Sequence, residues 1–178
     1  MKTTTDHFLT THAGSLPRSD ELVRTLMAYA RGESVDMAKL AEESHAATLT
    51  VVRRQAELGI DVANNGEQAR ESFFTYVQHR MSGFGGQGHR APFQDMLKYP
   101  HWTRAKMPGY DGGVNLTTAP QAQGEVRYVD RSPLDNELAT FDAALAACGR
   151  PFAETFLTAP SPGIIAAAME DTWYARQY

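Results

Sequence analysis

The chain has 178 residues, a formal net charge of −4 and a hydrophobic fraction of 42%. This length is enough to bury a sizeable core, and we predict a single domain over residues 1–178. The acidic balance and the lack of a basic run argue against nucleic-acid binding. No apolar stretch approaches the roughly 20 residues that cross a bilayer, and residues 1–6 lack the apolar core of a signal peptide. We therefore expect a cytoplasmic protein without membrane contact.

The first half of the chain predicts two short strands and three helices. A strand is expected over residues 7–11, followed by a turn. Helices are expected over 19–32 and 34–58, because apolar side chains recur there at helical spacing. Gly59 then ends the second helix, and residues 60–63 predict a short buried strand. A third helix is expected over 68–81.

The second half begins with a change of composition. Residues 82–113 are rich in glycine, proline and aromatic side chains. A flexible linker would contain fewer aromatic residues, so we expect a long insertion that packs, with a short helix over 92–99. Beyond it we predict, in chain order, a strand over 124–130, a helix over 133–148, a strand over 152–157 and a helix from 164 towards the end.

Strands that alternate with helices predict right-handed βαβ units and a parallel sheet. The fold class is therefore α/β. Four expected strands are too few to close an eight-stranded barrel, which takes about 250 residues. The parallel βα units thus form either a small open sheet or about half of a (β/α)₈ barrel.

Polar clusters follow three of the expected strands, at residues 12–18, 64–67 and 158–163. In open parallel sheets and in closed barrels, ligands bind at the carboxyl ends of the strands. The sequence therefore predicts a shared ligand site at this edge, and Ser161 of the third cluster is one of its candidate residues.

The first cluster contains His12, Gly14, Ser15 and Arg18. Its backbone N–H groups, hydroxyl and guanidinium suit a small anionic ligand. A second interpretation is a plain connection in which Gly14 turns the chain, Ser15 caps the next helix and Pro17 opens it. His12 is correspondingly either a site residue or a hydrogen-bonded structural histidine.

Glu67 follows Asn64, Asn65 and Gly66, a turn that would place its carboxylate over the strand ends. There it could accept a hydrogen bond from an ammonium group, complement a metal or act as a base. The alternative is a solvated glutamate at a helix N-terminus. Asp61, inside an apolar strand, is expected to pair with an arginine or a backbone amide.

Metal-ligand patterns are missing from the sequence. None of the six histidines has an i, i+4 partner, and none is paired with a cysteine. The single cysteine, Cys148, excludes an internal disulfide and any site that needs two cysteine ligands from this chain. We therefore assign no metal ligand to this chain.

Three segments resemble the cobalamin-independent methionine synthase family, in particular its short single-barrel members. Thr-Thr-His-Ala-Gly-Ser-Leu-Pro-Arg at 10–18 is similar to the first-strand signature of that family. The segment 55–67, which ends in Gly66-Glu67, is similar to the second helix and strand, and 152–163 to the fourth strand and its loop. The three segments keep their order and approximate spacing along almost the whole chain.

The resemblance implies a (β/α)₈ barrel with one zinc ion, which activates homocysteine as a thiolate for methyl transfer from a methylated folate or another donor. It also implies that Ser15 binds the amino-acid substrate through backbone and hydroxyl, and that Glu67 holds its ammonium group. Relatives include enzymes that add or remove other thiols, such as coenzyme M. A lyase or transferase for another small thiol is therefore one alternative, and a non-catalytic binding or regulatory module is another.

The family places its zinc ligands, a His-x-Cys pair, a glutamate and a later cysteine, in the second half of the barrel. This chain has no His-x-Cys pair, so it resembles the N-terminal, substrate-side half. A half-barrel exposes two sheet edges. We expect a complementary chain that supplies the second half, or self-association, and activity only after completion.

Overall fold

The computed structural model describes residues 6–88, 94–106, 119–149 and 152–176. The chain divides into two compact units. The first comprises Met1–Phe73 and Arg131–Ala159, and the second comprises Phe74–Asp130 and Pro160–Tyr178. The single domain expected over residues 1–178 stays a prediction.

Three helices of the first unit confirm the sequence periodicity. They are α1 (Asp20–Ala30), α2 (Met37–Glu57) and α5 (Ser132–Ala147). The hydroxyl of Ser19 accepts from the Leu22 N–H at the start of α1. The Asp36 carboxylate does the same for the second and third residues of α2. Side chains of this kind satisfy N–H groups that the first helical turn leaves unpaired.

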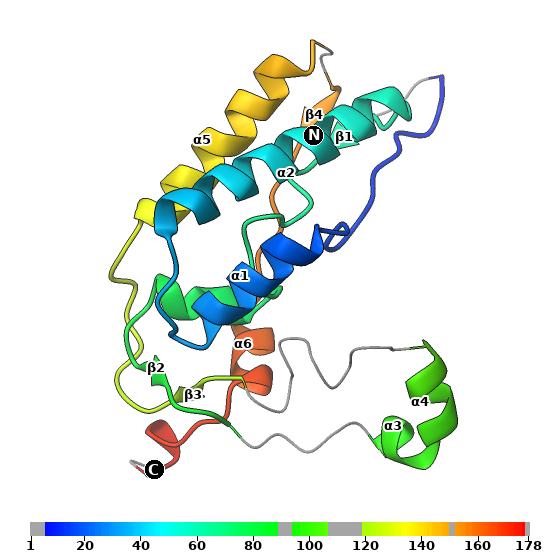
Figure 1. Cartoon of the computed structure of the whole chain (residues 1–178). Coiled ribbons are helices and arrows are strands. Elements are labelled where there is room, and N and C mark those ends of the chain that lie inside the picture. The colour runs from blue at the N-terminus through cyan, green and yellow to red at the C-terminus, as the bar shows by residue number, and fades with distance from the viewer. Residues whose placement is uncertain (1–5, 89–93, 107–118, 150–151, 177–178) are drawn as a thin grey trace. The chain divides into compact units, whose positions relative to one another are not determined.

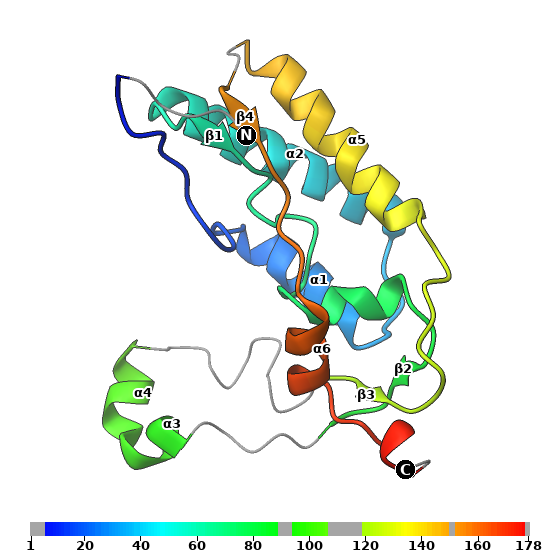
Figure 2. The ribbon, with the colours of Figure 1, turned by 180° about the vertical axis from the view of Figure 1, so that it is seen from behind.

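Two parallel strands, β1 (Val62–Ala63) and β4 (Glu154–Thr155), lie side by side (Figures 1 and 2). Val62 is in register with Glu154, and Ala63 with Thr155. The predicted strands at 60–63 and 152–157 are thereby confirmed in shorter form. This parallel pair is compatible with an α/β fold.

The expected strand over residues 7–11 is not formed. Its ladder with the β1 region is limited to one carbonyl, that of Thr10, which accepts from the N–H groups of Asp61 and Val62 at 3.1 and 3.0 Å. The Thr10 N–H is instead donated to the Asp61 carboxylate. The Asp61 side chain thus takes the N–H group that would otherwise pair with a backbone carbonyl of a neighbouring strand.

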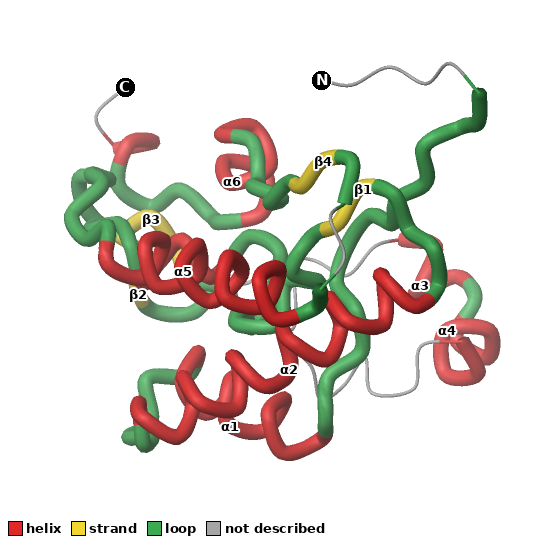
Figure 3. The backbone as a smooth tube through the Cα atoms, turned by 90° about the horizontal axis from the view of Figure 1, so that it is seen from above, coloured by secondary structure: helices red, strands yellow, loops and turns green. Residues whose placement is uncertain are grey.

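The core of the first unit lies where α2 and α5 pack against the strands. Figure 3 shows the two helices running alongside each other. Their buried apolar cluster contains Val52, Ala63, Phe141 and Ala144. A second cluster joins α1 to the start of α2 and contains Leu22, Leu26 and Leu40. The first cluster holds β1, which the turn over residues 64–67 follows, against α2 and α5.

The second unit is built from short elements. They are η1 (Thr75–His79), β2 (Phe84–Gly85), α3 (Gln94–Lys98), α4 (Pro100–Lys106), β3 (Gln121–Ala122), α6 (Pro162–Ala168) and η3 (Tyr174–Arg176). The strands β2 and β3 are antiparallel, with Phe84 opposite Ala122. The expectation of parallel pairing throughout is therefore wrong here. The predicted insertion contains β2, α3 and α4, and its residues 89–93 and 107–113 lie outside the described residues.

Three further expectations for these segments are wrong. Residues 68–81 form turns and the 3-10 helix η1, because Gln68, Arg70 and Thr75 are all buried and do not fit a helix with one apolar face. The strand over 124–130 is reduced to an isolated bridge of Tyr128 with Met81. The last helix ends at Ala168, and the Asp171 carboxylate then accepts from three successive N–H groups to start η3.

The segment predicted as a short helix over 92–99 contains α3, while Pro92 itself lies outside the described residues. Within the described ranges, no helix is long and apolar enough to cross a membrane.

Candidate functional site

The chain takes a left-handed course directly after β1. Gly66 has φ 62° and Glu67 has φ 56°, and Glu67 is the only non-glycine residue with positive φ in the described part of the chain. The two preceding asparagines support this turn, because Asn64 Oδ1 accepts from the Gly66 N–H at 2.8 Å and Asn65 Oδ1 accepts from the Glu67 N–H at 3.0 Å. Such a backbone persists only where its surroundings over-determine it, and it is common at functional sites.

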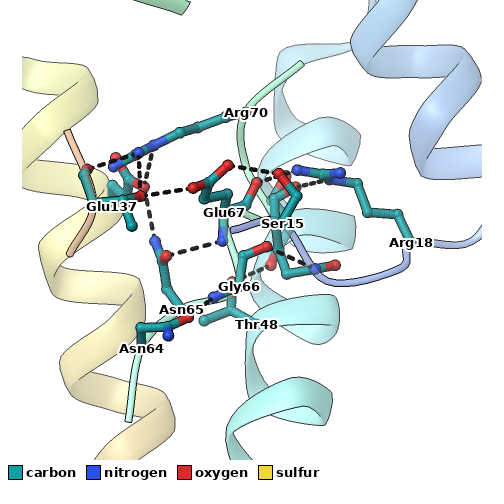
Figure 4. Close-up of polar contacts among 12 residues, drawn as sticks. Ser15, Arg18, Thr48, Asn64, Asn65, Gly66, Glu67, Arg70 and Glu137 are labelled. Carbon is teal, nitrogen blue, oxygen red and sulfur yellow. Dashed lines mark hydrogen bonds and ion pairs between the residues drawn. The ribbon is translucent and has the colours of Figure 1, made fainter. Parts of the chain in front are cut away.

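The carboxylate of Glu67 is buried, with the residue 1% exposed, and receives one hydroxyl on each oxygen (Figure 4). Ser15 Oγ donates to Oε2 at 2.5 Å from the loop before α1. Thr158 Oγ1 donates to Oε1 at 2.8 Å from the loop after β4. One residue from each of the three polar clusters singled out in the sequence is therefore in contact.

Arg70 and Glu137 extend these contacts into a closed ring. Arg70 Nη1 donates to the carbonyl and the hydroxyl of Thr158, at 2.9 and 3.1 Å. Arg70 Nε lies 2.8 Å from Glu137 Oε1, and Asn65 Nδ2 donates to the same oxygen at 2.7 Å. Since Asn65 also accepts from the Glu67 N–H, the path returns to Glu67 (Figure 4).

The loop that contains Ser15 is held to the Gly66 turn by side chains that donate to main-chain carbonyls. Arg18 donates from Nε to the Gln68 carbonyl at 3.2 Å and from Nη2 to the Glu67 carbonyl. Burial lowers the pKa of Arg18, against the opposing effect of nearby carboxylates. Gln68 Nε2 donates to the carbonyls of Leu16 and Gly66 at 3.0 and 3.1 Å. Arg18 therefore uses two of its nitrogens to hold the site together.

His12 lies beside the same turn, since its carbonyl accepts from Asn64 Nδ2 at 3.1 Å. Its two ring nitrogens are buried and have no hydrogen-bond partner among the described residues. This favours a site residue over a hydrogen-bonded structural histidine, and the assignment of His12 to the site stays a prediction.

The remaining predicted residues have simpler surroundings. Gly14 has φ 83°, and a Cβ there would meet no atom within 4 Å. Ser161 belongs to the second unit, where its hydroxyl accepts from the Ile164 N–H at the start of α6. Asp61 accepts from the backbone N–H and hydroxyl of Thr10, each at 2.9 Å, which confirms the predicted amide partner.

Sequence reasoning did not single out Thr158, Arg70, Glu137 or Asn65 as site residues. Thr158 stands at the start of the third polar cluster, so its position after a strand was an available signal. Arg70 and Glu137 carry no local signal. Their partners lie 88 positions away for Arg70 and Thr158, and 72 for Glu137 and Asn65.

The described residues do not fit a zinc ion. Among them, no three His, Cys, Asp or Glu side chains lie close enough together to hold a metal. The Sγ atom of Cys148, at the end of α5, contacts the Leu145 carbonyl at 3.0 Å. We derive no chemical step through a metal from these residues.

The arrangement is suited to a small cationic group. In the described part of the chain, no lysine, arginine or histidine nitrogen lies within 4.0 Å of the Glu67 carboxylate, whose partners are two neutral hydroxyls. A carboxylate oxygen has two acceptor positions, so each can take a further donor. A buried carboxylate whose direct contacts are neutral hydroxyls gains from a ligand ammonium group.

The segment that contains Ser15 and Glu67 is similar in sequence to known proteins. Residues 8–93 match the model for the catalytic domain of the cobalamin-independent synthases. A methionine synthase of Sulfolobus acidocaldarius is 39% identical over 80 residues, which are 45% of this chain and 23% of that protein. A 5-methyltetrahydropteroyltriglutamate–homocysteine methyltransferase of Acidiphilium cryptum is 35% identical over 82 residues, 46% of this chain and 10% of that protein.

The matched region thus spans less than a quarter of these relatives, and Glu137 and Thr158 lie outside the family match. Ser15, Asn65, Glu67 and Arg70 lie inside it. Residues 8–93 of this chain are therefore similar to the catalytic domain of the cobalamin-independent synthases.

Proposed function

We propose that the first unit binds the amino-acid part of a small thiol, homocysteine or a close analogue, in a methyl transfer like that of methionine synthase. The observation that carries the proposal is the buried Glu67 carboxylate, which two neutral hydroxyls contact and which makes no direct ion pair with a described side chain. The names of the two relatives support methyl transfer to homocysteine.

Each residue has a stated role in this proposal. Glu67 accepts the substrate ammonium group, and the Gly14–Ser15 loop takes the substrate carboxylate through backbone N–H groups. The Ser15 hydroxyl, which donates to Glu67 Oε2 in this structure, contributes to this contact by turning its proton to the substrate. Arg18 holds this loop against the Gly66 turn. His12 is a further candidate substrate contact, because its ring nitrogens have no hydrogen-bond partner among the described residues. Ser161 belongs to the second unit, and its place in the site stays a prediction.

The proposal also includes a partner. We propose that this chain forms about half of a (β/α)₈ barrel in the cytoplasm, completed by a complementary chain or by a second copy. The zinc ligands and the methyl donor, a methylated folate or another compound, belong to that complementary part. Copurification with a chain that carries a His-x-Cys pair and a distal cysteine tests this point, and an active complex without zinc would contradict it.

Calorimetric titration of the full chain with homocysteine, in the presence of a phosphine reductant, tests the substrate assignment. We expect measurable binding, with clearly weaker binding of 4-mercaptobutanoate, which lacks the amino group. Glu67→Gln should weaken homocysteine binding about tenfold or more, because a charge-assisted hydrogen bond is lost. Glu57→Gln, at an exposed residue near the end of α2, is the matched control and should leave the affinity unchanged.

The other functions are outcomes of the same titrations. If coenzyme M, which has no amino group, binds as tightly as homocysteine, the chain acts on another thiol. If homocysteine binds tightly but the completed complex performs no methyl transfer, the chain is a binding module. If the wild-type chain binds no homocysteine, the substrate assignment is wrong.

A further inference from the structure

The side chain of Arg70 sets the direction in which the Thr158 hydroxyl points. Arginine has only donors, so Thr158 Oγ1 must accept where it faces Arg70 Nη1 at 3.1 Å. Its single proton is then available to its other partner, Glu67 Oε1, at 2.8 Å. The same Nη1 holds the Thr158 carbonyl at 2.9 Å, so the backbone beneath the hydroxyl is held as well.

Glu137 performs a similar task on the other side of Glu67. Its Oε1 accepts from Asn65 Nδ2 at 2.7 Å, and this contact decides which end of the Asn65 amide carries the nitrogen. The opposite end, Oδ1, is thereby turned to the Glu67 N–H at 3.0 Å. Glu137 thus acts on the backbone of Glu67, while Arg70 acts on its carboxylate.

Arg70 and Glu137 form an ion pair that is almost completely buried, with side chains 3% and 4% exposed. A buried ion pair is often no more stabilising than apolar side chains of the same volume, so stability alone does not account for it. Here the pair connects α5 both to the carboxylate and to the backbone N–H of Glu67, a residue held at φ 56°. A left-handed glutamate needs such support to keep one orientation.

We propose that Arg70 and Glu137 are positioning residues, which fix the Glu67 carboxylate through Thr158 and Asn65 so that it receives the α-ammonium group of an amino-acid thiol. This inference rests on the proposed function. It states that the Arg70–Glu137 pair makes the site prefer thiols with an amino group over thiols without one. Neither residue contacts the ligand in this scheme.

Arg70→Lys in the full chain is the main test. Lysine keeps the charge but presents a single ammonium, which cannot replace the two guanidinium nitrogens that face Glu137 and Thr158. Arg54→Lys, in an exposed pair with Glu57 on α2, is the matched control. The first readout is the ratio of calorimetric affinities for homocysteine and 4-mercaptobutanoate. We expect Arg70→Lys to reduce this ratio about tenfold, and Arg54→Lys to leave it unchanged.

The second readout needs no ligand. The Glu67 amide, bonded to Asn65, should exchange its proton about tenfold faster in Arg70→Lys when followed by NMR. The Phe156 amide, bonded to the Ala63 carbonyl beside β4, should keep its rate. If Arg70→Lys fails to fold, Thr158→Val removes only the hydroxyl link to the Glu67 carboxylate. It should reduce the thiol preference, and Thr158→Ser should restore it.

The outcomes separate the two proposals. A folded Arg70→Lys protein with unchanged thiol preference and unchanged Glu67 exchange overturns the positioning role. Equal acceleration of the Glu67 and Phe156 amides also overturns it, because the pair then supports only the fold. If the wild-type chain binds no homocysteine, the proposed function fails, and the amide exchange still decides whether the pair positions Glu67.

Discussion

Ser15 and Glu67, 52 positions apart in the sequence, share a hydrogen bond of 2.5 Å between Oγ and Oε2. Ser15 is exposed, whereas Glu67 is 1% exposed. The serine therefore lies on the solvent side of the Glu67 carboxylate. On the interior side, the carboxylate contacts Thr158, which is held by Arg70 and, through it, by Glu137.

Ser15→Ala should destabilise the chain by about 1 kcal/mol, because Glu67 Oε2 loses its hydroxyl donor. Urea unfolding followed by circular dichroism measures this change. Ser34→Ala is the control, since Ser34 is exposed in the loop before α2. An equal effect of the two substitutions would contradict a stabilising Ser15–Glu67 bond.

Glu137→Leu should be far more damaging, with a loss of about 3–5 kcal/mol in the free energy of unfolding, because the buried Arg70 guanidinium is left without its ion-pair partner. The double variant Arg70→Met, Glu137→Leu should recover much of this loss, since apolar side chains can fill the same volume. Urea titrations of the single and double variants measure both steps. A double variant no more stable than Glu137→Leu alone would contradict the prediction.

Gly66→Ala should destabilise the chain by about 1–3 kcal/mol. Its φ of 62° disfavours alanine, and the new Cβ would lie 3.1 Å from Leu16 Cβ and Cδ1. Gly59→Ala, at φ 80° with no atom within 4 Å, carries the backbone cost without the crowding. The difference between their thermal unfolding midpoints measures the crowding against Leu16 and against Gln68 Nε2, which would lie 3.3 Å from the new Cβ. Identical midpoints would show that both side chains move aside at no cost.

The contact between the N-terminal segment and β1 should depend on pH in two directions. Hydrogen bonds that His7 donates to Asp61 and then to Asp6 raise the pKa of His7. Hydrogen bonds from Thr10 and then His7 lower the pKa of Asp61. The His7 contribution is fully present below the ordinary histidine pKa of 6.5 and is lost as pH rises through the raised value. The Asp61 contribution is present above the ordinary pKa of 3.8 and is lost as pH falls through the lowered value.

The Thr10 amide, which donates to Asp61, reports this contact. Its protection factor, measured by NMR against intrinsic exchange at each pH, should be highest between the two pKa values. His7→Gln should remove the loss on the alkaline side and keep the loss on the acidic side. Protection that is independent of pH would contradict the assignment.

Local patterns predicted the helices of the first unit well. In α1 and α2, apolar side chains recur on one face, and capping residues precede the first turn, so nearby residues suffice to specify them. The Gly66-Glu67 turn was predicted for the same reason, because a glycine after a short apolar strand is a local signal.

The rest of the site depends on residues that are distant in the sequence. Glu137 lies on α5 among residues that predict an ordinary helix, and only the packing of α2 and α5 brings it to Asn65. In segment 68–81, buried polar groups outweighed an apparent helical pattern. Arg18 was predicted for its charge, whereas the structure uses its geometry to hold two carbonyls.

The closed ring of Asn65, Glu67, Arg70, Glu137 and Thr158 constrains how this protein can change over evolutionary time. Each of the five residues contacts two others of the ring, so the first replacement removes one contact from each of two neighbours. Replacing one of these neighbours afterwards destabilises the protein less than the same replacement in the intact ring. Mutational effects within the ring will therefore be epistatic. Lineages should keep these five residues together or exchange several of them at once.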